Sequence, residues 1–227
     1  MFIKALATVV TAATISLSFI TSTYADSGFS GFASDLGDGY KSVYSQDNLP
    51  WLGKTLLVGG VFANTDLDQE IQKSYNRNIL SDSSDSFAEK AKIIGDPETT
   101  LLYFGLAAVN RFACDRDCGP VPEWGDRSLQ ALLVGLPAVW TSQAILGGAR
   151  PRHGVGSEWN ILEFDYEHAV SGHAYVGAVP FLTAAQMTDN PYAKAVFYGL
   201  SPLTALSRIN DQKHYFSQAL MGWLYAA

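Results

Sequence analysis

The sequence is poor in the residues that disulfide scaffolds, metal clusters and nucleic-acid interfaces need. Its 227 residues include two cysteines and four histidines, and its formal net charge is −7. A chain this acidic, without a basic stripe, binds nucleic acid poorly, so no nucleic-acid partner is expected. Cys114 and Cys118 lie four positions apart and no second pair follows them, which leaves a metal site short of ligands.

Strand signals are also scarce, because the apolar runs carry Ala, Leu and Gly more than alternating β-branched residues. We therefore expect an all-α helical bundle, formed by one domain over residues 51–227. An apolar stretch at 51–62 opens it, and helical patterns follow at 67–80, 87–94, 98–113, 128–146, 174–187, 192–209 and 214–226. Residues 26–50 are expected to be a loosely ordered lead-in, 81–86 a polar link, 115–127 a loop, and about 150–169 irregular. Most apolar runs carry Gln, Asn, Ser or Thr within any window of about 20 residues, which favours a soluble protein over a polytopic one.

Acidic residues alternate where the pattern over 67–80 begins. Asp66, Asp68 and Glu70 have the spacing of a calcium loop, but the glycine and the closing glutamate of such a loop are missing. The sequence therefore predicts a solvated first helical turn at this point.

The first 25 residues have the features of a secretory signal. Lys4 supplies the positive charge, residues 5–20 are apolar but short for a membrane span, and Thr23-Tyr24-Ala25 offers small residues for cleavage before Asp26. We expect an exported protein, located in a bacterial periplasm. Export exposes the chain to oxidising conditions, so a disulfide between Cys114 and Cys118 is expected.

Two short stretches place polar groups in a segment that is otherwise small and apolar. They are Ser171-Gly172-His173, and Ser207-Arg208 followed by His214. Buried polar groups are costly without partners, so this concentration indicates an anion site. A neutral imidazole can attack phosphorus, a protonated one can donate to the leaving alkoxide, and a guanidinium can grip phosphate oxygens in pairs. This chemistry needs no cofactor and no metal.

The arrangement resembles the type 2 phosphatidic-acid phosphatase superfamily, which includes bacterial non-specific acid phosphatases and vanadium haloperoxidases. The pattern of that superfamily is Lys-x6-Arg-Pro, then Pro-Ser-Gly-His, then Ser-Arg-x5-His-x3-Asp. Arg150-Pro151 matches the first block, Ser171-Gly172-His173 the second, and Ser207-Arg208 with His214 the third. The match spans residues 143–218, and the resemblance implies the helical bundle of the acid phosphatase and haloperoxidase core.

Three positions depart from the pattern. Gln143 stands in place of the lysine, Val170 in place of the second proline, and Gln218 in place of the last aspartate. Gln143 can still donate an N–H to phosphate, although a neutral hydrogen bond is worth only about 1 kcal/mol. The side-chain oxygen of Gln218 can accept a hydrogen bond from the ring N–H of His214 but carries no charge, so its effect depends on which way the amide faces. Asp211 is an alternative carboxylate if the last helix already includes it.

The resemblance assigns roles to these residues. His214 would be the nucleophile, His173 the general acid, and Gln218 the group that orients His214. The phosphoryl oxygens would be held by Arg150, Arg208, Ser171, Gly172 and, more weakly, Gln143. His153 and His168 are expected to be structural.

The resemblance implies an exported, metal-independent phosphatase acting through a phosphohistidine. Its substrate is expected to be a phosphate-containing small molecule or lipid, and membrane-surface association and oligomeric state are left open. Because Gln143 and Gln218 replace charged residues, the alternative is an envelope protein that binds phosphate-bearing ligands with weak turnover or none. Halide oxidation with vanadate is disfavoured, since the missing lysine weakens the hold on a permanently bound oxyanion.

Overall fold

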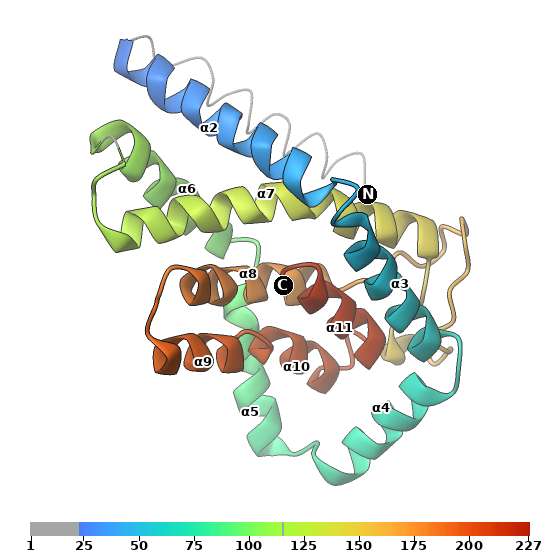
Figure 1. Ribbon diagram of the computed structural model, residues 1–227. Helices are drawn as coiled ribbons and strands as arrows, with labels where there is room; N and C mark the ends of the chain where they lie inside the picture. Colours follow the sequence, from blue (N-terminus) through green and yellow to red (C-terminus); the bar gives the residue numbers. More distant parts are fainter. Residues whose placement is uncertain (1–22, 115) are drawn as a thin grey trace.

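The computed structural model describes residues 23–114 and 116–227 of the chain, and all regular secondary structure in this part is helical, with no strand (Figure 1). The fold class expected from the sequence is confirmed. The elements are α2 (Thr23–Val43), α3 (Leu49–Ala63), α4 (Leu67–Asn78), α5 (Asp82–Ala91), η1 (Lys92–Gly95), α6 (Thr99–Ala108), η2 (Val109–Ala113), α7 (Pro120–Leu146), η3 (Pro151–His153), α8 (Gly172–Gln186), α9 (Pro191–Leu200), α10 (Leu203–Asn210) and α11 (Phe216–Leu224). Of the predicted signal sequence, residues 1–22 lie outside the described residues.

The long helix α7 is the axis of the bundle, and it contacts α2, α6 and α8 (Figure 1). It begins at Pro120, inside the segment that the sequence analysis expects to be a loop. Pro120 has no N–H that would need an acceptor at a helix start, and its fixed φ suits the first helical turn. The proline and glycine content of this segment therefore predicts a loop where a helix in fact begins. The helix ends where expected, at Gly147 and Gly148, whose φ values of 67° and 107° suit glycine.

Helix α2 corrects the expectation of a loosely ordered lead-in at residues 26–50. Pro137 within α7 has no N–H to donate to the carbonyl of Leu133, and the hydroxyl of Tyr40 donates to that carbonyl over 2.8 Å. Further along, Asp35 accepts from the buried guanidinium of Arg111 over 2.9 Å. These contacts come from distant parts of the chain, so local composition does not reveal them.

Two smaller differences have local causes. Residues 81–86, expected to be a polar link, are the start of α5, where Ser81 and Ser84 bond each other's backbone N–H as a capping box. The pattern over 192–209 is two helices, because α9 ends at Leu200 and α10 begins after Pro202. The helix predicted over 214–226 begins two residues later, at Phe216.

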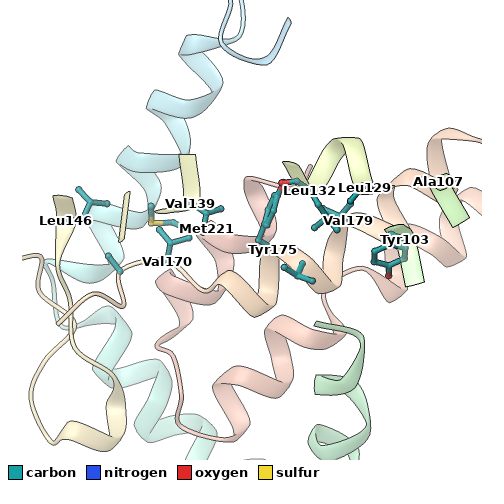
Figure 2. Packing of buried hydrophobic residues seen from close by; sticks show 12 residues of the cluster. Tyr103, Ala107, Leu129, Leu132, Val139, Leu146, Val170, Tyr175, Val179 and Met221 are labelled. Carbon is teal, nitrogen blue, oxygen red and sulfur yellow. The ribbon is translucent and has the colours of Figure 1, made fainter. Parts of the chain in front are cut away.

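The main core lies between α7, α8 and the C-terminal helix α11 (Figure 2). Val139, Tyr175 and Met221 are almost completely buried, and the hydroxyl of Tyr175 donates to the carbonyl of Ala131 over 2.6 Å. Burying aromatic and aliphatic side chains of this size contributes roughly 1.5–3 kcal/mol each. The core therefore fixes the ends of α7, α8 and α11 relative to one another.

The first turn of α4 is solvated as predicted except at Asp68. Asp68 is 0% exposed, because its carboxylate faces α11 rather than water. Glu70, two residues later, is exposed and pairs with Lys73 over 2.8 Å. An alternation of acidic residues cannot distinguish these two environments, since only the packing of α4 on α11 buries one of them.

Cys114 and Cys118 form a disulfide, with 5.2 Å between their Cα atoms. Within the described part of the chain, one helix, Pro120–His153 including the residues that continue α7, is long and apolar enough to cross a membrane. This finding rests on length and composition alone, and a core helix of a soluble protein passes the same test.

Candidate functional site

The candidate site lies where the end of α7, the start of α8, the end of α10 and the start of α11 meet. Ser171 is the N-cap of α8, Arg208 lies in the last turn of α10, and His214 precedes α11 by two residues. The charges of Arg150 and His173 act on His214, and those of Arg150 and Arg208 act on His173. The residues predicted from the three sequence blocks are thus neighbours in space.

Gln218 binds His214 in one defined orientation. Its Oε1 accepts the backbone N–H of Tyr215 and lies 3.1 Å from Nδ1 of His214, while its Nε2 donates to the carbonyl of Ala149 over 2.7 Å. A flipped amide would place an NH2 against an N–H and an oxygen against a carbonyl, so the network selects this orientation. His214 must then carry its proton on Nδ1, which leaves Nε2 with a free lone pair.

His214 is also held in its neutral form. Burial, followed by the positive charge of Arg150, lowers its pKa well below the ordinary value, and the bond to Gln218 offsets this only in part. A neutral imidazole with a free Nε2 is the form that can act as a nucleophile.

Gln143 connects the end of α7 to the start of α8. Its Nε2 donates to the carbonyl of Val170 over 2.6 Å, and it is the nearest atom that a side chain at Gly172 would meet. One of its two amide protons therefore holds the backbone that leads into Ser171. The other remains the group that can serve as the predicted weak phosphate ligand.

Ser171 and Gly172 form the start of α8. The Ser171 side chain is buried, and its Oγ accepts the N–H of Ala174 over 3.2 Å as a helix cap. The backbone N–H of Ser171 donates to the carbonyl of Gln218 over 2.9 Å, which ties α8 to α11. A helix start of this kind favours an anion.

Arg208 and Asp211 form a pair at the end of α10. Nη2 of Arg208 donates to Oδ2 of Asp211 over 2.5 Å. Asp211 is the C-cap of α10, and α11 begins only at Phe216, so the alternative that Asp211 lies one turn before His214 on the same helix is wrong. Its carboxylate orients Arg208 instead.

Arg150 has an unused donor. Its side chain is half-buried, and its Nε has no hydrogen-bond partner among the described residues, although buried donors are nearly always paired. Burial lowers the pKa of Arg150, and so do the nearby charges of Arg152 and Arg208. An unpaired guanidinium N–H beside other cations is suited to an anionic ligand.

Sequence reasoning missed two cations near these residues. Burial lowers the pKa of Lys213, and Arg152, Arg150 and Arg208 lower it further, so the four positive charges lie close enough to repel one another. Such a group is notable in a chain with a net charge of −7. Lys213 directly precedes the motif histidine and Arg152 follows Pro151, but no spacing rule distinguished them from surface residues.

Two other histidines line the same region. The ring of His168 lies 6.3 Å from that of His214, and burial with the charge of Arg150 lowers its pKa to about 4. His153 accepts the backbone N–H of Arg150 at Nδ1 over 3.2 Å and stacks on Tyr166. His153 thus has a structural contact of the kind expected, whereas His168 lies closer to the nucleophile candidate than the sequence indicates.

His173 is more accessible than His214, with 39% of its side chain exposed, and its Nε2 lies 3.8 Å from Oδ1 of Asp96. Burial and the charge of Arg208 lower its pKa, while Asp96 acts in the opposite direction. Its proton affinity therefore depends on the balance between arginines, carboxylate and any bound anion.

Comparison with known proteins gives one family. Residues 130–227 match the PAP2 superfamily, whose members are typically phosphatases and act on phosphate-containing substrates. No curated protein and no solved structure matches the chain. The match covers all the candidate site residues from Gln143 to Gln218, so this part of the chain is similar to the PAP2 superfamily.

Proposed function

We propose that the protein is an exported phosphatase that hydrolyses phosphomonoesters or lipid-linked phosphates through a phosphohistidine on His214. The orientation of Gln218 carries this proposal, because it leaves Nε2 of His214 unprotonated and free. The unpaired Nε of Arg150 and the surrounding positive charges supply the anion site beside it.

In the first step, the lone pair of His214 Nε2 attacks phosphorus and the bond from phosphorus to the leaving oxygen breaks. The electron pair goes to that oxygen, and protonated His173 donates a proton to it. In the second step, water attacks the phosphohistidine, neutral His173 takes the proton of that water, and the electrons of the broken P–N bond return to Nε2. The products are an alcohol and inorganic phosphate.

His173 must be protonated at the start, although its pKa is lowered in the free protein. A bound phosphate dianion offsets the positive charges of Arg150 and Arg208, so substrate binding raises the pKa of His173. The same arginines stabilise the charge that develops on the equatorial oxygens of the transition state.

The replacement of the family aspartate by Gln218 limits the rate in this scheme. The amide fixes the tautomer of His214 but cannot stabilise the positive charge that develops on the ring. This is the reason to retain the alternative of a protein that binds phosphate-bearing ligands on the same scaffold without turnover.

The test is hydrolysis of p-nitrophenyl phosphate by the mature protein in excess EDTA. We expect turnover that resists the chelator and disappears in His214→Ala. Because p-nitrophenolate leaves without protonation, His173→Ala is expected to form the phosphoenzyme. Its hydrolysis should be slow, because His173 no longer takes the proton of water, so acid-labile phosphoprotein accumulates. A wild-type protein that binds phosphate but turns over neither this ester nor a lipid phosphate would favour the binding scaffold.

Export is tested separately. Expression with the native N-terminus in a Gram-negative host should yield periplasmic protein that begins at Asp26. Full-length protein in the cytoplasm would refute the signal sequence without affecting the chemistry.

A further inference from the structure

Asp68 is a buried charge that the proposed reaction does not use. It lies on α4, outside the segment that matches the superfamily, and is 0% exposed. Its Oδ1 accepts the backbone N–H of Ser217 over 2.8 Å, and its Oδ2 accepts the hydroxyl of Ser217 over 2.5 Å. A buried carboxylate is expensive, so its presence requires a reason.

The environment of Asp68 disfavours its charged form overall. Burial raises the pKa of Asp68, and the hydrogen bonds from Ser217 and from the side chain of Ser157 oppose this rise only in part. Since Ser217 lies in the first turn of α11, the negative charge also faces the positive end of that helix.

The bonds of Asp68 lead directly to the nucleophile. Ser217 and Gln218 are neighbours in the first turn of α11, and Gln218 Oε1 holds both the N–H of Tyr215 and Nδ1 of His214. A rotation or shift of this turn would move Oε1 away from His214. In this turn, Ser217 donates both its backbone N–H and its hydroxyl to Asp68 of α4.

We propose that Asp68 is a positioning residue of the site: its carboxylate fixes the first turn of α11 and so aims Gln218 at His214. This inference rests on the proposed function, because it assigns Asp68 to the orientation of the proposed nucleophile. The sequence motif does not include Asp68, which lies on α4, well before the motif residues 143–218.

The first variant is Asp68→Asn, which keeps an oxygen for the N–H of Ser217 and an amide for its hydroxyl but removes the charge. Ser217→Ala removes the side-chain bond alone. Glu70→Gln is the matched control, since Glu70 lies on the same helix but is exposed and pairs only with Lys73 among the described residues. For Asp68→Asn we expect kcat to fall by about 10–100-fold, as for other supporting residues, with KM nearly unchanged. Ser217→Ala should show a smaller fall, and Glu70→Gln none.

The second readout is the tautomer of His214, followed by ¹⁵N NMR of labelled protein without substrate. The wild type should show the Nδ1–H form, and Asp68→Asn a smaller fraction of it. An unchanged kcat and tautomer in Asp68→Asn would overturn the inference, as would a lower melting temperature with an unchanged tautomer, which indicates a structural role alone. If the wild type has no turnover at all, the proposed function fails, while the tautomer still decides whether Asp68 orients His214.

Discussion

Oε1 of Gln218 lies 3.1 Å from Nδ1 of His214 and at the same distance from the backbone N–H nitrogen of Tyr215. A neutral side chain therefore occupies the place of a family carboxylate and keeps one half of its task. It holds the imidazole in the tautomer that frees Nε2, and in the proposed reaction it supplies no charge to stabilise the imidazolium character of the ring.

Gln218→Asp should raise kcat and lower stability at the same time. The carboxylate adds the missing charge, but the bond from Nε2 to the carbonyl of Ala149 is lost, at a cost of about 1–3 kcal/mol for the unsatisfied buried group. Steady-state hydrolysis of p-nitrophenyl phosphate and urea unfolding measure the two effects. A variant that is less stable and no faster would show that the charge does not limit the rate.

Arg150→Ala should abolish most activity with little loss of stability. The guanidinium would lose its contact with the transition state, which we expect to lower kcat by roughly 100–1,000-fold. Its Nε has no hydrogen-bond partner within residues 23–114 and 116–227, so no bond at that atom to these residues is lost. Arg127→Ala, which removes an exposed arginine paired with Glu123, is the control and should remain fully active. Equal activity of the two variants would refute a role for Arg150 in phosphate binding.

Folding stability should decrease as the pH falls below neutrality. Burial and nearby arginines lower the pKa values of His168, His173 and His214, to about 4 for His168. The unfolded chain then binds more protons than the folded protein below about pH 6.5, so the stability from these groups is present above that pH and is lost toward pH 4. The raised pKa of Asp68 acts in the opposite direction.

Thermal unfolding between pH 8 and pH 4.5 measures this dependence. His168→Gln should make the slope shallower, because one of the groups that binds protons on unfolding is removed. Added inorganic phosphate should raise the melting temperature, since it binds the folded protein alone. A melting temperature that does not change with pH would contradict the assignment of neutral, buried histidines.

Tyr40→Phe should destabilise the bundle without touching the site. The hydroxyl of Tyr40 satisfies the carbonyl of Leu133, which Pro137 leaves without a helical donor. Its loss should cost about 1 kcal/mol in the free energy of unfolding. Tyr192→Phe is the control, because Tyr192 is 83% exposed. Urea unfolding compares the two, and equal midpoints would show that the bond contributes nothing.

Much of the fold could be predicted from the sequence because its signals are local. Gly147 and Gly148 end α7 where expected, and Ser171-Gly172 opens α8. The motif spacing also predicted which side chains lie near one another, since the charges of Arg150 and His173 act on His214 and those of Arg150 and Arg208 act on His173. These features depend on a few consecutive residues or on an order of blocks along the chain.

What the sequence could not reveal depends on contacts between distant segments. Asp68 and Glu70 have the same local pattern, and only the packing of α4 on α11 buries the first. The orientation of the Gln218 amide is selected by the backbone of Tyr215 and Ala149 together. The helix at the N-terminal end is stabilised by contacts with α7 and Arg111, against a glycine- and serine-rich composition.

Two hydrogen bonds connect the segment that matches the family model to residues that precede it. Residues 130–227 contain the whole motif. The carbonyl of Leu133, which Pro137 leaves without a helical donor, accepts the hydroxyl of Tyr40 instead. The first turn of α11 is held by a hydrogen bond from the N–H of Ser217 to the carboxylate of Asp68. The segment that matches the family model is thus shorter than the helical bundle to which these contacts belong. A fragment of residues 130–227 alone would contain every motif residue but lack Tyr40 and Asp68, whose hydrogen bonds hold α7 and the first turn of α11.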